Sequence, residues 1–251
     1  MSTSVDRITP HVTVDPAVLS AAGWQDAAAV VTEPFTDWVL AGEFPAGRPA
    51  WETAGARFVH DIEPWEHRKL WLLNGAHSLL TFAGRRRGLE TVAAAIADPE
   101  CRALVDAFWA DAIACLPHGI EHEQYRAQLL ERFANPRIEH RLEQIAADST
   151  TKVQYRFAAV AELARASGWV PAGAERANAE WISWLLEGPA TPDTRADAVS
   201  AAAASDRPVE ALIRVISDLL GDDPGCVARV GDYLRSENTL RKRRNHEHRQ
   251  G

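Results

Sequence analysis

The chain has 251 residues, of which 46% are hydrophobic and 25% are charged, and its formal net charge is −8. These values are typical of a globular protein with a sizeable core, and the negative charge argues against general nucleic-acid binding. No segment approaches the roughly 18 consecutive apolar residues of a membrane span, and the N-terminus has no apolar signal core. We therefore expect neither nucleic acid nor a membrane as a partner, and a cytoplasmic location.

The first part of the chain, up to about residue 65, is rich in proline and glycine. Two short extended runs, Ala28–Thr32 and Phe35–Leu40, are separated by Glu33-Pro34. Apolar and β-branched residues bounded by proline favour short strands. The sequence therefore predicts a connector that contains a small strand pair.

From Glu63-Pro64 onward the pattern becomes helical, and prolines stand where first helical turns begin. Gly75 lies inside the first helical run, which suggests a close backbone approach or a local kink there. Long helices joined by short turns predict a mainly α body over residues 28–235, followed by a polar tail, 236–251, that we expect to be disordered. The predicted helices are Lys69–Phe82, Leu89–Ala97, Pro99–Ile113, His122–Phe133, Ile138–Gln154, Phe157–Ala166, Ala174–Leu186, Asp193–Ala204 and Pro208–Leu219.

Four polar residues interrupt the otherwise apolar run around residue 70: Glu66, Lys69, Asn74 and His77. On a helical wheel they fall at roughly 60°, 0°, 140° and 80°, so one face of a helix carries all four. A buried polar group without a partner costs on the order of 1–3 kcal/mol. Such a face therefore either meets solvent or lines a site.

The two interpretations of this face lead to different chemistry. In a site, a lysine among apolar neighbours and near a histidine has its ammonium form disfavoured, which makes Lys69 a usable general base. Asn74 and His77 would then donate hydrogen bonds to the oxygen whose proton the lysine takes. In a surface helix, Glu66 and Lys69 would form an i, i+3 ion pair and His77 would be a core residue. Spacing alone leaves both open.

Several sequence motifs resemble those of one enzyme family. Lys69-x4-Asn74-Gly75-x-His77, preceded by Glu66, is similar to the polyol-specific long-chain dehydrogenase/reductase family, which includes mannitol 2-dehydrogenases and fructuronate reductases. The resemblance covers about residues 5 to 190. Further segments that agree in order and spacing are Val5–Pro10, Val31–Val39, Phe44–Pro49, Glu131–Pro136 and Gln144–Lys152.

The resemblance implies a fold and a cofactor. The expected fold is a multi-helical C-terminal dehydrogenase domain of the 6-phosphogluconate dehydrogenase type, and residues 1–27 would be the remnant of a junction to a cofactor domain. NAD or NADP would be bound mainly by a Rossmann domain that this chain lacks, because its fifteen glycines include no Gly-x-Gly pair. A separate Rossmann domain is therefore an expected partner.

The resemblance also implies catalytic roles. Lys69 would be the general acid and base, Asn74 and His77 would polarise the substrate oxygen, and Glu66 would relay the proton toward solvent. The expected reaction interconverts a polyol or an aldonate with its keto sugar, as mannitol with fructose or mannonate with fructuronate. The alternative is a catalytically silent binding or assembly module.

Three further residues are expected to contact the substrate. Lys152 would hold the distal hydroxyls or a carboxylate, and Gln144 stands where family members often carry an arginine. Asp6 would lie close to the substrate. A solvated helix lysine is the other interpretation of Lys152.

A metal site is not expected. The three cysteines are odd in number and far apart, which disfavours thiolate ligation and a disulfide framework. His118 and His122 have the i, i+4 spacing of a helical metal pair, but Pro117 and Gly119 place His118 in a turn and no third ligand is evident.

Overall fold

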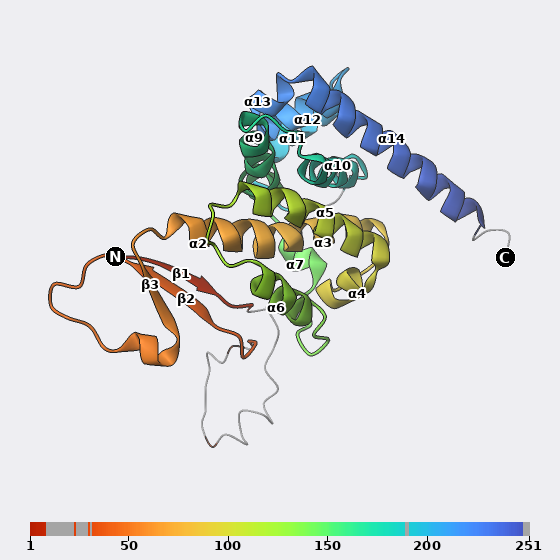
Figure 1. The fold of residues 1–251 in the computed structure, drawn as a ribbon. Helices are drawn as coiled ribbons and strands as arrows, with labels where there is room; N and C mark the ends of the chain where they lie inside the picture. Colours follow the sequence, from red (N-terminus) through yellow and green to blue (C-terminus); the bar gives the residue numbers. More distant parts are fainter. Residues whose placement is uncertain (9–22, 24–29, 31, 189–190, 248–251) are drawn as a thin grey trace.

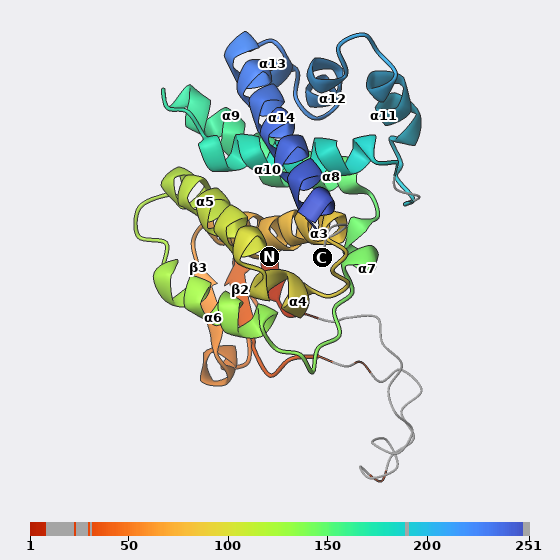
Figure 2. The same ribbon diagram turned by 90° about the vertical axis from the view of Figure 1, so that its right-hand side faces the viewer.

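The computed structural model describes residues 1–8, 23, 30, 32–188 and 191–247, with side chains up to Glu237. Its elements form three tiers in Figure 1: a small sheet and α6 lie below, a long central helix runs through the middle, and α9 to α14 lie above. The view in Figure 2, turned by 90°, keeps the same order of tiers. The central helix is therefore covered on both sides.

The N-terminal sheet has three strands: β1 (Ser2–Asp6), β2 (Asp37–Ala41) and β3 (Ala56–Val59). β1 pairs antiparallel with β2, with Val5 opposite Trp38, whereas β2 and β3 are parallel. Of the predicted pair, Phe35–Leu40 overlaps β2. The run Ala28–Thr32 lies largely outside the described residues, and the two that are described there, Val30 and Thr32, are not in a strand.

The expected boundary at residue 27 stays a prediction, but β1 and β2 pair across it. Residues 2–6 lie before that boundary and residues 37–41 lie after it, yet both belong to one sheet. The N-terminal strand is therefore an integral part of the same structural unit as β2. The boundary was inferred from the family resemblance, which did not anticipate this pairing.

The central helix is continuous but not regular. α2 (Glu63–Arg68) passes into a π-helical segment, η2 (Lys69–Gly75), and then into α3 (Ala76–Arg86), with helical dihedral angles at both junctions. Pro64 stands in the first turn, as predicted. The predicted helix is thus confirmed. Its π-helical segment was not predicted, because the helical wheel assumed a regular α-helix.

The predicted mainly α fold is confirmed, and most predicted helices have a counterpart. Asp98 caps α5 as its sequence indicates, because its carboxylate accepts a hydrogen bond of 2.8 Å from the Cys101 amide. The remaining elements are η1 (Trp51–Ala54), α4 (Val92–Ala97), α5 (Pro99–Cys115), α6 (Glu123–Phe133), α7 (Leu142–Ala146), α8 (Ser149–Val153), η3 (Gln154–Ala158), α9 (Ala159–Ala166), α10 (Ala172–Leu186), α11 (Ala196–Ala203), α12 (Pro208–Ile216), α13 (Asp218–Gly221) and α14 (Pro224–Glu247).

The predicted helix Ile138–Gln154 is wrong, because the chain breaks between α7 and α8. Asp148 adopts a left-handed conformation with φ of 48°, which an L residue other than glycine rarely does. Its amide donates to the Pro192 carbonyl (2.8 Å), and its carboxylate accepts from the Thr194 amide (2.9 Å). These contacts from a distant loop hold the break that helix propensity alone would not produce.

The predicted disordered tail is also corrected. α14 continues to Glu247, well past Ser236, and Figure 1 shows its end extending beyond the other helices. Leu, Arg, Lys and Glu in this segment favour helix, and Glu237 pairs with Arg176 at 3.2 Å. Residues 248–251 lie outside the described residues. Among the residues described, no helix combines the length and apolar character that crossing a membrane requires.

Two glycines let helices approach α5 closely. A Cβ built on Gly173 of α10 would lie 2.2 Å from the Ala107 carbonyl oxygen, and one on Gly75 would lie 2.6 Å from Cε1 of Phe108. The close approach expected at Gly75 is therefore present. The two positions differ, since a ring can shift but a backbone carbonyl inside a helix cannot.

We predict that Gly173→Ala destabilises the chain by about 2–3 kcal/mol, because the added methyl group must push two helices apart. Gly231→Ala is the matched control. It is also a helical glycine, but its Cβ would meet only the end of the Arg235 side chain, at 3.3 Å, so the higher helix propensity of alanine should leave it neutral or stabilised. Urea denaturation followed by circular dichroism measures both, and equal midpoints for the two variants would contradict the close packing.

Candidate functional site

The π-helical segment η2 receives hydrogen bonds from two distant side chains. The Trp109 indole Nε1 donates to the Leu72 carbonyl (2.8 Å), and the Arg156 Nη1 donates to the Asn74 carbonyl (3.0 Å). Side chains that insert into the backbone ladder distort helices, and π-helical turns occur often at functional sites. Arg156 itself lies in the second π-helical segment, η3, which packs against η2.

Lys69 and Asn74 are the partly exposed polar residues at the two ends of η2. Trp71, Leu72 and Leu73 between them are buried in the core. The Lys69 side chain makes no hydrogen bond or ion pair with any residue that the structure describes. The side chains of Lys69 and Asn74 are therefore both reached by solvent, and Lys69 lies at the boundary of the apolar core rather than inside it.

The surface-helix interpretation required an ion pair between Glu66 and Lys69. Glu66 is exposed on α2, one turn before Lys69, and the ion pairs found within the described part of the chain do not include one between them. The ion pair of the surface-helix interpretation is therefore not formed, and the roles of Glu66 and Lys69 in a site stay predictions.

His77 is buried, with 6% of its surface exposed, and packs between two aromatic rings. The ring centres of Phe133 and His140 lie 4.7 Å and 4.8 Å from that of His77. Burial, followed by the positive charges of His140, Arg156 and Arg132, holds the pKa of His77 well below its ordinary value. The imidazole is neutral, and its buried Nε2 has no hydrogen-bond partner among the described residues. A buried nitrogen without a protein partner is suited to form a hydrogen bond with an oxygen atom of a ligand.

The depressed pKa of His77 predicts a pH-dependent stability. In the unfolded chain, His77 binds a proton as the pH falls through about 6.5, whereas in the folded chain it stays neutral. Its contribution to the free energy of unfolding is therefore fully present above that pH and is lost as the pH falls below it. Unfolding free energies measured from pH 8 to about pH 5 should decline less steeply in His77→Gln than in the wild type.

A histidine on an exposed turn supplies the control for this experiment. His118→Gln changes a side chain that lies in solvent, and its pH profile should match that of the wild type. If His77→Gln and the wild type decline in parallel, His77 is not held neutral by the fold.

Lys152 lies in α8, at the junction with η3. Its ammonium donates to the carbonyls of Ile145 (2.9 Å) and Ala147 (2.6 Å), and burial together with Arg156 lowers its pKa. The Lys152 side chain is therefore fixed by two hydrogen bonds to the backbone and is not a solvated helix lysine. Gln144 lies on α7 with an exposed side chain.

Sequence reasoning missed Arg156. Its Nη1 donates to the Ser78 hydroxyl (2.6 Å) as well as to the Asn74 carbonyl, and its charge acts on both His77 and Lys152. The available signal was its position four residues after Lys152, which places the two side chains one helical turn apart. The structure thus gathers Asn74, His77, Lys152 and Arg156 around the contact between η2 and η3.

Asp6 lies in a buried ion cluster that ties β1 to α6. Its carboxylate accepts hydrogen bonds from Arg132 (Nη2, 2.7 Å) and from the Tyr125 hydroxyl, and Arg132 also pairs with Glu33 at 2.7 Å. Glu33 accepts a further bond from the Ile8 amide. Both oxygens of Asp6 are thus engaged by protein groups, and its contact with a substrate stays a prediction.

We predict that Arg132→Met destabilises the chain by about 3–5 kcal/mol, because it leaves two buried carboxylates without a counter-charge. Arg102→Met is the control, since Arg102 forms only an exposed i, i+4 pair with Asp106 and such pairs contribute about 0.3–0.5 kcal/mol. Chemical denaturation at pH 7 compares them. A loss below about 1 kcal/mol in Arg132→Met would show that the cluster does not anchor the sheet.

The described residues hold no group of three His, Cys, Asp or Glu side chains arranged to bind a metal ion. Burial raises the pKa of Cys101 to about 12, so this thiol does not ionise near neutral pH.

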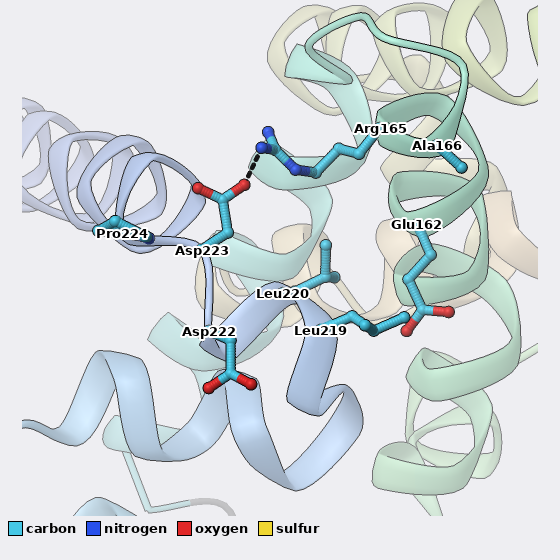
Figure 3. Close-up of a pocket in the computed structure, with 8 residues that line it drawn as sticks. All are labelled: Glu162, Arg165, Ala166, Leu219, Leu220, Asp222, Asp223 and Pro224. Atoms are coloured by element: carbon cyan, nitrogen blue, oxygen red, sulfur yellow. Dashed lines mark ion pairs between the residues drawn. The ribbon is translucent and has the colours of Figure 1, made fainter.

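A pocket of about 560 Å³ lies elsewhere, between α9 and α13 (Figure 3). Arg165 and Asp223 form an ion pair at its side, and Leu219 faces Glu162 across it. None of the predicted site residues lines this pocket.

Comparison with known proteins identifies the family. A model of the mannitol dehydrogenase C-terminal domain matches residues 61–217. The chain belongs to this family. The matched residues include six of the seven predicted site residues as well as Arg156, whereas Asp6 lies outside them.

Named relatives agree with this assignment. The chain is 38% identical over 160 residues to D-mannonate oxidoreductase of Escherichia coli, covering 62% of this chain and 33% of that protein. It is 40% identical over 156 residues to D-arabinitol 4-dehydrogenase of Ralstonia nicotianae, covering 61% of this chain and 34% of that protein. The chain thus spans about a third of the length of these curated relatives.

A solved structure covers more of the chain. The ternary complex of Pseudomonas fluorescens mannitol 2-dehydrogenase with NAD and D-mannitol superimposes with a TM-score of 0.81 at 29% identity. The match covers 99% of this chain and 54% of that one. The similarity therefore extends beyond residues 61–217 to the N-terminal sheet.

Proposed function

We propose that this chain carries the substrate-binding and acid/base half of a nicotinamide-dependent oxidoreductase that interconverts a polyol or an aldonate with its keto sugar. The family assignment and the names of the relatives support this class of reaction. The observation that carries the proposal is the arrangement at η2, where Lys69 and Asn74 are both partly exposed and their side chains have no partner among the described residues. One turn on, His77 keeps a buried nitrogen without a partner.

The residues present can handle the alcohol oxygen and its proton. In the oxidation direction the free amine of Lys69 accepts the proton of the carbinol oxygen, while the carbon gives up its hydride and becomes a carbonyl. The Asn74 side-chain amide and the neutral His77 imidazole donate hydrogen bonds to the oxygen and stabilise its alkoxide character. Lys69 lies at the surface, so its proton passes to solvent directly or through Glu66.

A nicotinamide cofactor would accept the hydride when bound. Within the described residues, however, no element fits its pyrophosphate. The parallel strands β2 and β3 are joined through η1, a short 3-10 turn, and not through a helix that follows a glycine-rich turn. We therefore propose that this chain binds the substrate and transfers its proton. NAD or NADP would be bound mainly by a separate Rossmann domain.

We predict that Lys69→Ala lowers the turnover of polyol or aldonate oxidation by about 10²–10⁴-fold, the usual contribution of a positioned general base. The assay uses this chain joined to the cofactor-binding part of a relative such as the Pseudomonas fluorescens enzyme. Added primary amines should restore part of the rate, because they replace the missing base.

Asn74→Ala is the matched variant for that assay. It removes a hydrogen-bond donor and leaves the base in place, so its rate should fall without responding to added amines. Full turnover in Lys69→Ala, with only a lower melting temperature, would show that the lysine is structural and that the proposed mechanism is wrong.

A further inference from the structure

Arg156 differs from the other arginines that link elements within the core. Arg68 pairs with Asp37, Arg86 with Glu180 and Arg132 with Asp6, so each has a carboxylate partner. Arg156 is partly buried and forms no ion pair within the described part of the chain, and burial alone lowers its pKa to about 10. Its charge is therefore not compensated by the protein.

The other cations near the contact of η2 and η3 do not have close carboxylates either. Lys152 donates only to two backbone carbonyls, and Lys69 has no partner among the described residues. Asp148 and Asp193 act on Lys152 from a distance, but Asp148 accepts from the Thr194 amide. Asp193 is occupied by Ser149 and Thr150. Lys152 thus has only these more distant carboxylates, and Arg156 has none among the described residues.

The guanidinium of Arg156 is also held in place before any ligand binds. Nη1 donates to both the Asn74 carbonyl and the Ser78 hydroxyl, which fixes the plane of the group. Nε and Nη2 donate to no residue that the structure describes, and they are not enclosed by protein. A fixed guanidinium with a free edge suits the two oxygens of a carboxylate, which it binds in a bidentate manner.

We infer that the site is built for a sugar acid, whose carboxylate binds the free edge of Arg156 with Lys152 beside it. This inference rests on the proposed function and narrows its substrate class to an aldonate and the corresponding keto acid. Arg156 would then have two contacts with the reaction site: one to the backbone of Asn74, and one to the end of the substrate remote from the reacting carbon.

Two ligands that differ only at one end test the inference. D-Mannonate carries a carboxylate where D-mannitol carries a hydroxymethyl group, so calorimetric titration of this chain with each isolates the contribution of the charge. We expect D-mannonate to bind on the order of tenfold more tightly or better, as charge-assisted bidentate pairs do. Arg156→Met should lose this preference, so the ratio of the two affinities is compared, because the lost hydrogen bond to the Asn74 carbonyl can weaken the binding of both ligands.

Control variants separate binding from structure. Arg195→Met also removes a hydrogen bond to η3, the one at 3.3 Å to the Gln154 side chain, and should keep the preference for D-mannonate. If Arg156→Met does not fold, Arg156→Lys decides: it keeps the charge but loses the planar fork, so the preference should shrink several-fold. An unchanged preference in Arg156→Lys would contradict a bidentate contact.

The remaining outcomes are distinguishable. Equal affinities for D-mannonate and D-mannitol in the wild type would overturn the inference and leave the proposed function standing. Competition by acetate or inorganic phosphate at the same concentration as D-mannonate would show a general anion site and would also overturn it. If the wild type binds neither D-mannonate nor D-mannitol, the proposed function fails together with the inference.

Discussion

The hydrogen bonds that enter η2 from outside the central helix determine the arrangement of the site. Trp109 reaches the Leu72 carbonyl and Arg156 reaches the Asn74 carbonyl, so two backbone acceptors bind side chains from α5 and η3. A regular α-helix would need those carbonyls for its own ladder. The wider turn keeps Trp71, Leu72 and Leu73 in the core and leaves Lys69 and Asn74 at its surface. The site is therefore a consequence of tertiary packing onto one helix.

Charge is distributed unevenly around this helix. On the side of the sheet, Asp6 and Glu33 compensate Arg132, and the cluster fixes β1 against α6. On the side of η3, Arg156 and Lys152 have no such carboxylates, and His77 lies between the two regions as a neutral group. Buried charges without partners are expensive, and their retention in a folded protein indicates that something else compensates them. A substrate anion satisfies that requirement.

The sequence predicted the helical body better than it predicted the local geometry of the central helix. Lys69, Asn74 and His77 were selected as candidate site residues because polar groups in an apolar helical run are rare. The π-helical turn was not found, because it depends on donors 37 and 82 residues away along the chain.

Other misses have the same origin. The break at Asp148 depends on the loop at Pro192, and β1 has the polar sequence Ser-Thr-Ser-Val-Asp, which becomes a strand only through its pairing with β2. Local patterns therefore sufficed for helices with strong caps, such as α5, and failed wherever a contact from a distant segment decided the backbone conformation.

A crystal structure of this chain with D-mannonate tests the central claim most directly, because it shows which surface receives the ligand. We predict that the carboxylate lies within hydrogen-bond distance of the Arg156 guanidinium, and that a carbinol oxygen lies between the Lys69 ammonium and the Asn74 amide. D-Mannonate bound instead in the pocket between α9 and α13, with Lys69 and Arg156 unoccupied, would contradict it.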